Sequence, residues 1–337
     1  MGCEGGLEEK TSHMMQCLGS GQKDVLLPLS DVLAPVGVPT VAVLLASFNG
    51  VLWIAEQMAS ILQQSGIHVT VFVSDDQSAD GTREWLVRRS VDEPRIILLA
   101  ANPRFGGAAR NFFRLIRDVD FSAFDYVALA DQDDIWLPSK LIAAHRSIVE
   151  LGVSAYSSNV TAFWLDGRER QTDKAQAQRK YDFLFEAAGP GCTYVMKTEA
   201  AERCKSFIVA NWADVNACSL HDWLIYAWFR ASGLTWYIDQ KSYVRYRQHH
   251  ANQVGVNTGW QAAANRLSLL QKNWYRSHVG KIVALTRGLM KNDAVAVVIG
   301  QRGGAVSLFT LLRHGRQFRR RARDRYYLWF FVILGIY

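Results

Sequence analysis

Between residues 40 and 150 the chain alternates short apolar runs with longer amphipathic stretches, and this alternation constrains its fold more than any other feature. Continuous apolar strands separated by helices indicate a mainly parallel sheet that helices cover on both faces. We therefore predict an α/β, Rossmann-like fold, in which ligands bind at the carboxyl ends of the strands. The predicted strands are Thr40–Ser47, Val69–Ser74, Arg95–Ala100 and Tyr126–Ala130, and the predicted helices cover 53–65, 80–89, 108–117 and 138–150.

The pattern changes after residue 150, which predicts a second half of the same domain and then a helical extension. We assign residues 39–150 to the first half, 151–260 to the second and 261–337 to the extension, and we interpret 1–38 as a poorly ordered lead-in. The second half is expected to contain strands at 153–161, 192–197, 236–239 and 242–247, a polar loop at 166–180 and a helix at 220–231.

Three carboxylates follow the fourth strand directly, at Asp131, Asp133 and Asp134. Residues i and i+2 of an extended backbone point the same way, so we expect Asp131 and Asp133 to converge on one cation. Asp134 is then expected to point away and to anchor the loop. Carboxylate oxygens suit Mg²⁺ or Mn²⁺, whose shell substrate phosphates often complete. An acidic pair alone is weak evidence, since acidic loop starts are mostly solvated or capping.

Polar residues also follow the first two strands, at the edge where a nucleotide would rest. Ser47 and Asn49 end the first strand, although the Asn-Gly pair there also fits a simple turn. After the second strand, Asp75 is the candidate for accepting a hydrogen bond from a base N–H or a ribose hydroxyl. Asp76 and Asp80 are interpreted as turn and cap residues.

Four segments, taken in order, resemble the family 2 glycosyltransferases with the GT-A fold over about residues 40–255. The segments are Ala46–Gly50 (ASFNG), Ser74–Thr82 (SDDQSADGT), Asn102–Asn111 (NPRFGGAARN) and Ala130–Leu141 (ADQDDIWLPSKL). His221-Asp-Trp223, followed by Tyr246-Arg-Gln-His249, is similar to the rhamnosyltransferase-like branch. The resemblance implies a nucleotide-diphosphate sugar donor (dTDP- or UDP-linked), a divalent metal, inversion at the anomeric carbon and a role in bacterial surface polysaccharide synthesis.

Inverting transfer needs a base for the acceptor hydroxyl, and a positioned carboxylate can serve. Asp222 is our candidate; by itself the pattern favours an N-cap there, but the resemblance places the family's base at this position, and Ser219 offers an alternative cap. His221 either tunes Asp222 or packs. The glycines of 189–193 are expected to form the acceptor floor, and Trp223 and Trp228 either stack on sugars or belong to the core.

The departing diphosphate needs its negative charge neutralised, by metal or by arginine. We assign Asp133 as the direct metal ligand and Asp131 to the ribose or to the metal's water shell. Arg247 is assigned to a phosphate, with Arg245 as a competing contact, and His249 either to a phosphate or to the metal. The alternative is that these strand residues are simply exposed.

Charge is concentrated near the carboxyl end of the chain. The whole chain has a net charge of +7, and residues 313–325 alone contain seven arginines and one aspartate. A short apolar, aromatic tail follows them. This tail is too short to span a bilayer, so we predict that 313–337 lies on an anionic membrane surface. The alternative is a helix docked on the protein's own core with a solvated basic face. Nucleic acid is not expected, because no reading module accompanies the arginines.

These features together predict a cytoplasmic enzyme, peripheral on the inner face of the cell membrane. Five cysteines without a CxxC pair fit a reducing cytosol. The acceptor is expected to be a lipid-linked glycan. One alternative is a nucleotidyltransferase, which would carry basic residues right after the first strand, whereas this chain has none until Arg83. Another is an inactive assembly partner, which would be expected to lack the acidic residues.

Overall fold

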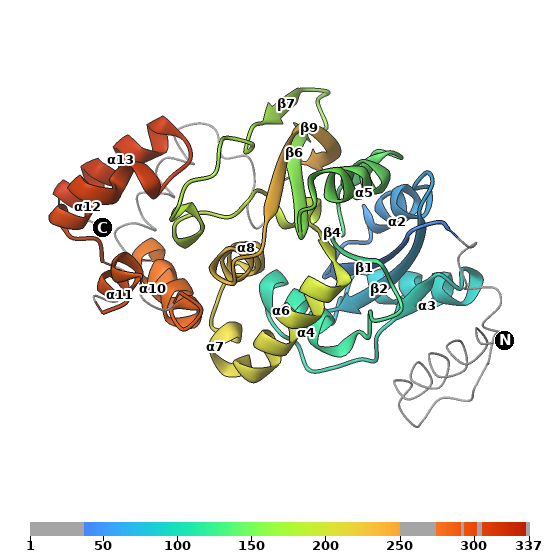
Figure 1. Cartoon of the computed structure of the whole chain (residues 1–337). Coiled ribbons are helices and arrows are strands. Elements are labelled where there is room, and N and C mark those ends of the chain that lie inside the picture. The colour runs from blue at the N-terminus through green and yellow to red at the C-terminus, as the bar shows by residue number, and fades with distance from the viewer. Residues whose placement is uncertain (1–36, 250–273, 291–292, 302–304, 335–337) are drawn as a thin grey trace, which may run out of the picture.

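The computed structural model describes residues 37–249, 274–290, 293–301 and 305–334. Its centre is a nine-stranded sheet in the order β3-β2-β1-β4-β8-β6-β9-β5, with β7 paired to β6. Helices lie on both faces of this sheet (Figure 1). The predicted α/β, Rossmann-like fold is confirmed. The lead-in over 1–38 lies outside the described residues, apart from its last two.

The four strands of the first half form a parallel set that brings their polar ends together. Their bounds are β1 Thr40–Ser47, β2 His68–Asp75, β3 Ile96–Leu98 and β4 Tyr126–Asp131. In this register Ser47 lies opposite Asp75, and Ala46 opposite Asp131. The carboxyl ends predicted to carry the site therefore meet at one edge.

The second half continues the same sheet with mixed directions. Its strands are β5 Ile135–Trp136, β6 Ala155–Phe163, β7 Glu169–Thr172, β8 Val195–Lys197 and β9 Trp236–Arg247. Two predictions were wrong: β7 occupies part of the expected loop 166–180, and β9 is one strand rather than two. The ladder between β6 and β9 shifts register around Asn159, whose side-chain amide donates to the Gln240 carbonyl at 2.8 Å. That bond links β6 to β9 at the irregularity.

Alternate residues of the buried strands separate two cores. On β1, Val41, Val43 and Leu45 pack with α2, α3 and α5, whereas Ala42 and Leu44 face the core that includes α4, α6 and α8. The helix bounds are α2 Ile54–Leu62, α3 Thr82–Asp92, α4 Ala108–Asp118, α5 Lys140–Leu151, α6 Thr198–Ala210, α7 Trp212–Asn216 and α8 His221–Ala231.

The extension is helical where it is described, and it packs on the second half through α10 (Figure 1). Its helices are α10 Trp274–Thr286, α11 Ala294–Gln301, α12 Leu308–His314 and α13 Ala322–Ile333. Within the described ranges, no helix combines the length and the apolar character that crossing a membrane requires.

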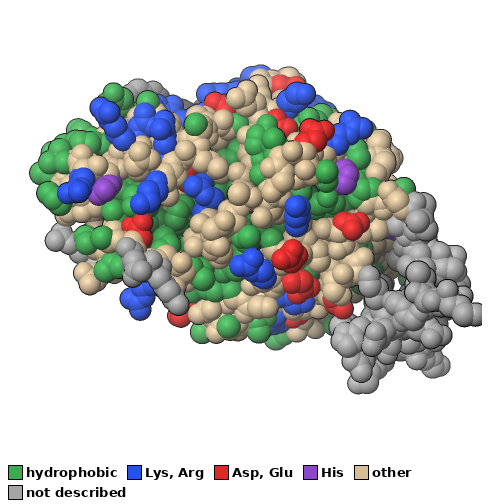
Figure 2. Space-filling view, in the orientation of Figure 1, with side chains coloured by type: hydrophobic (Ala, Val, Ile, Leu, Met, Phe, Trp, Pro, Cys, Tyr) green, Lys and Arg blue, Asp and Glu red, His purple; other side chains and the backbone are tan. Residues whose placement is uncertain are grey.

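The basic run is not one uniform solvated face. Arg320 is only 3% exposed and pairs with Asp182 and Glu186, and Arg319 pairs with Glu186 as well. These two arginines attach the extension to the second half. Apolar side chains of α12 and α13 nevertheless remain exposed: Figure 2 shows hydrophobic surface interspersed with Lys and Arg over these helices.

Candidate active site

The antiparallel pairing of β5 with β9 brings the end of β9 to the acidic loop after β4. Ile135 lies opposite Arg245 in this pairing. As a result, His249 Nε2 lies 2.9 Å from Asp133 Oδ2, and the Trp53 ring stacks on the His249 ring with 5.6 Å between centroids. The two side chains predicted to bind metal therefore lie together, although 116 positions separate them in the sequence.

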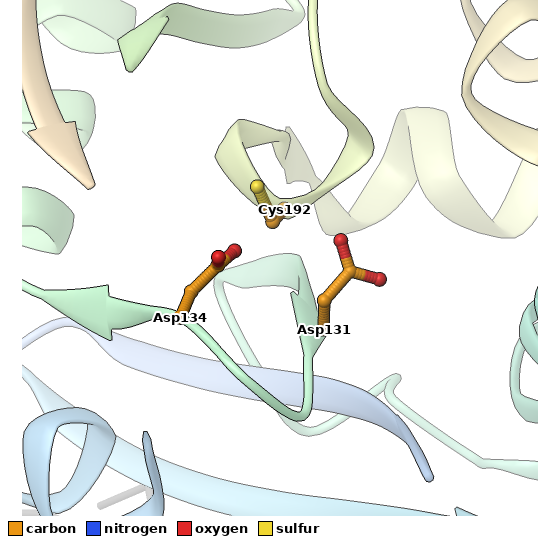
Figure 3. Close-up of side chains that lie close together, drawn as sticks. All are labelled: Asp131, Asp134 and Cys192. Carbon is orange, nitrogen blue, oxygen red and sulfur yellow. The ribbon is translucent and has the colours of Figure 1, made fainter. Parts of the chain in front are cut away.

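The sequence argument predicted that Asp134 points away from Asp131, and this prediction was wrong. In Figure 3 the carboxylates of Asp131 and Asp134 lie near the sulfur of Cys192, and one ligand atom of each lies within 4.8 Å of the others. The argument fails because residues 132–133 form a bend rather than extended backbone. Asp134 does anchor the loop, since its Oδ1 accepts a hydrogen bond from the Arg247 backbone amide at 3.3 Å.

Buried like charges characterise this edge of the sheet. Burial raises the pKa of Asp131 to about 8, with the carboxylates of Asp133 and Asp222 contributing to the rise. Burial and the carboxylates of Asp133 and Asp131 also raise the pKa of Asp134, whose Oδ2 has no hydrogen-bond partner among the described residues. A divalent cation would favour the ionised forms. Carboxylates with an imidazole fit Mg²⁺ or Mn²⁺, whereas the Cys192 thiol suits softer ions.

Ser47 and Asp75 lie side by side at the ends of β1 and β2. The Ser47 hydroxyl donates to Asp75 Oδ1 at 3.2 Å, and the Ser78 backbone amide donates to Asp75 Oδ2 at 3.0 Å. These bonds hold the Asp75 carboxylate, which is 3% exposed, at the edge where a nucleotide would rest. Its role as a contact to the base or ribose stays a prediction.

Asn49 connects two loops of this edge. Its Oδ1 accepts from the Ala79 amide at 2.9 Å, and its backbone has φ +48°. Gln132, to which the sequence analysis assigned no role, exchanges two hydrogen bonds with the Phe48 backbone. A Cβ at Gly50 would overlap the Gln132 side chain. Gly50 therefore permits the contact between the first loop and the acidic loop.

The remaining acidic residues of the second loop have distinct structural partners. Asp76 was predicted to stabilise its own turn. Instead it accepts hydrogen bonds from the backbone amides of Phe105 and Gly106, so it fixes the loop before α4. Asp80 accepts from the Thr82 amide at 3.0 Å, at the start of α3. The helix N-cap itself is Gly81, so the predicted capping role is displaced by one residue.

Arg247 lies beneath the acidic loop. Its Nε donates to the Asp133 carbonyl at 2.9 Å, its guanidinium pairs with Glu56, and the Trp53 ring lies 4.6 Å from the guanidinium carbon. The predicted phosphate contact is untested. Arg245 instead pairs with Glu169 of β7 at 2.7 Å, toward the outer edge of the sheet.

Asp222 lies in the first turn of α8, close enough to Asp131 for their charges to interact. Neither Asp222 nor Ser219 caps this helix, because Leu220 is the N-cap and no side chain bonds there. Burial raises the pKa of Asp222 to about 6, and the nearby Lys174 opposes the rise. A carboxylate with that pKa can accept a proton near neutral pH.

The segment Gly189–Thr193 forms a floor beside Asp222. A Cβ at Gly191 would lie 2.5 Å from His221 Nε2 and 3.3 Å from Asp222 Cβ, so glycine permits this close approach. His221 packs: its ring stacks on Phe112 at 4.0 Å between centroids, and burial lowers its pKa to about 3. Trp223 and Trp228 belong to the core, at 3% and 4% exposed.

Comparisons with known proteins agree on one family. The sequence pattern of the family described as Glycosyl transferase family 2 matches residues 42–227. The chain is 40% identical to the dTDP-rhamnosyl transferase RfbG of Shigella flexneri, over 87% of this chain and 100% of that protein. It is 27% identical to the Escherichia coli UDP-Glc:alpha-D-GlcNAc-diphosphoundecaprenol beta-1,3-glucosyltransferase WfgD, over 46% of this chain and 59% of that one.

Solved structures show the same fold. S. aureus TarS in complex with UDP-GlcNAc superposes with a TM-score of 0.52 at 13% identity, covering 88% of this chain and 80% of the TarS chain. At this identity the likeness concerns the arrangement of strands and helices.

Proposed function

We propose a specific reaction for this chain, which belongs to glycosyl transferase family 2 and is therefore a glycosyltransferase. It moves rhamnose from dTDP-rhamnose to a lipid-linked glycan, with inversion, in bacterial surface polysaccharide synthesis. The donor assignment is supported by 40% identity over the full length of RfbG, whose name specifies dTDP-rhamnosyl transfer. The lipid-linked acceptor is supported by the name of WfgD, which specifies a diphosphoundecaprenol acceptor.

The observation that carries the proposal is the meeting of Asp222 with the acidic loop. Asp222 accepts the proton of the acceptor hydroxyl as that oxygen attacks the anomeric carbon of the donor, and the bond to the diphosphate breaks on the opposite face. Ser47, Asn49 and Asp75 lie where the nucleoside would bind, at the carboxyl ends of β1 and β2. Arg247 lies close enough to the same loop to contact a phosphate.

Divalent metal dependence is part of the proposal. Asp133 and His249 would hold Mg²⁺ or Mn²⁺, and Asp131 would contact the ion's water shell or the donor ribose. When bound, the ion neutralises negative charge on the leaving diphosphate.

The test uses dTDP-rhamnose, Mn²⁺ and a lipid extract from a polysaccharide-producing bacterium. Wild-type protein should transfer labelled rhamnose to the lipid fraction. Asp222→Asn should keep its thermal stabilisation by dTDP-rhamnose, a mass-action effect, while losing transfer. Full turnover in Asp222→Asn would exclude the residue as the base. Hydrolysis of the donor in the presence of Mn²⁺ would show an active enzyme, whereas an inactive assembly partner would leave the donor intact. A nucleotidyltransferase would instead release diphosphate from a nucleoside triphosphate.

We also propose that the protein lies on the inner face of the cell membrane. Phe309 of α12 is 71% exposed, and Tyr326 and Phe330 of α13 are 74% and 57% exposed, beside exposed arginines. Such a surface suits an anionic bilayer. Deleting 313–337 is a poor test, because it removes the buried Arg320. Replacing Phe309 and Tyr326 by serine should weaken sedimentation with phosphatidylglycerol vesicles; unchanged sedimentation would exclude this face.

A further inference from the structure

Lys174 is a half-buried cation whose ammonium has no described carboxylate partner. It follows β7, and its backbone amide donates to Oδ1 of the buried Asn159 at 2.6 Å. Among the residues that the structure describes, no carboxylate oxygen lies within 4.0 Å of its Nζ. A charge placed this way costs free energy unless an opposite charge compensates it.

The Lys174 side chain lies next to the floor that supports Asp222. A Cβ placed on Gly189 would be 3.6 Å from Lys174 Cβ and 3.8 Å from its Cγ. The Tyr194 hydroxyl lies within hydrogen-bond distance of both the Gly189 carbonyl, at 3.3 Å, and the Asp222 carbonyl, at 3.2 Å. Lys174 is also the cation whose charge opposes the burial of the Asp222 carboxylate. The ammonium therefore belongs to the acceptor side of the site.

The carboxylates around Lys174 are already engaged by arginines of the extension. Arg321 pairs with Asp173 at 3.6 Å, and Arg320 pairs with Glu186 at 3.7 Å. These contacts fix the segment that carries Lys174 to the part of the chain with the exposed apolar helices α12 and α13. The segment that carries the lysine is thus tied to the part of the chain that we expect to contact lipid.

We propose that Lys174 binds the diphosphate of the acceptor, a polyprenyl diphosphate that carries a short glycan; this rests on the lipid-linked acceptor proposed above. An ammonium is a compact donor to phosphate oxygens. Because the Lys174 side chain lies beside Gly189 of the floor and its charge acts on Asp222, the reacting hydroxyl is on a sugar close to the diphosphate. Transfer therefore belongs to an early sugar addition, whose substrate comes from a reaction that attaches a sugar to a lipid diphosphate.

The test measures binding of farnesyl diphosphate to the full chain, with saturating dTDP and Mn²⁺ so that the donor site is filled. Lys174→Met should weaken this binding about tenfold to a hundredfold, the usual range for a lost charge-assisted contact, and Lys174→Arg should retain most of it. Lys180→Met is the matched control, because Lys180 lies in the same segment but is paired with Asp293. Inorganic diphosphate and farnesol separate the contribution of the phosphate from that of the lipid.

Equal affinity in wild type and Lys174→Met, or equal weakening in Lys174→Met and Lys180→Met, would overturn the inference. Retained stabilisation by dTDP shows that each variant is folded. The two proposals fail separately. If farnesyl diphosphate binding depends on Lys174 but no rhamnose is transferred, the proposed reaction is rejected and the proposed binding site is supported. If rhamnose is transferred but the binding does not depend on Lys174, only the binding site is rejected.

Discussion

Gly191→Ala should reduce transfer strongly while leaving donor binding intact. The new Cβ would lie 2.5 Å from His221 Nε2, about an ångström short of ordinary van der Waals contact. His221 has little freedom to yield, since its ring stacks on the fully buried Phe112. The strain therefore reaches Asp222, whose Cβ is already 3.3 Å from the added atom. A misplacement of about 1 Å in a catalytic group costs about a hundredfold in rate, or about 2.7 kcal/mol of activation free energy.

The assay compares kcat for rhamnose transfer with the dissociation constant for dTDP. Gly288→Ala is the matched control, because a Cβ there meets no atom within 4 Å. Overpacking should also lower the free energy of unfolding of Gly191→Ala by about 1–3 kcal/mol. If Gly191→Ala kept kcat within twofold of wild type, the floor would not be positioning Asp222, and the reasoning would be refuted.

Three further predictions rest on single side chains. Since burial raises the pKa of Asp222 to about 6, the basic form is lost as pH falls through that value, and transfer should drop about tenfold per pH unit below it; a flat profile from pH 7 to 4 would contradict this. Arg320→Ala should lower the free energy of unfolding in urea by about 3–5 kcal/mol, because it removes a buried cation that pairs with both Asp182 and Glu186. Arg323→Ala, whose side chain is 64% exposed, should change it by less than about 0.5 kcal/mol. Asp133→Ala should abolish the Mn²⁺ dependence of thermal stabilisation by dTDP, whereas the exposed Asp166→Ala should keep it.

The first half was predicted closely because its signals are local. A run such as Thr40–Ser47 is apolar throughout, and the structure makes it a strand with the same bounds. Helix α6, in contrast, was not predicted, although Ala200, Cys204 and Ile208 recur at helical spacing and are buried in the structure. That periodicity would have identified the helix.

Predictions about orientation were weaker than predictions about position. The expectation that Asp134 points away from Asp131 assumed extended backbone, and a bend reversed it. The arginines of the tail were considered as one basic surface, whereas Arg319 and Arg320 turn inward to Glu186. Local pattern does not determine such directions, because distant partners do.

The sequence by itself determined that acidic and polar residues end parallel strands, because apolar runs of strand length specify the sheet and a parallel sheet collects its carboxyl ends. Only the tertiary structure decided which of them meet. The pairing of β5 with β9 places His249 on Asp133, and Lys174, which has no carboxylate partner among the described residues, lies close enough to Asp222 for their charges to interact. These contacts join residues far apart in the chain, and their geometry depends on how whole strands and helices pack.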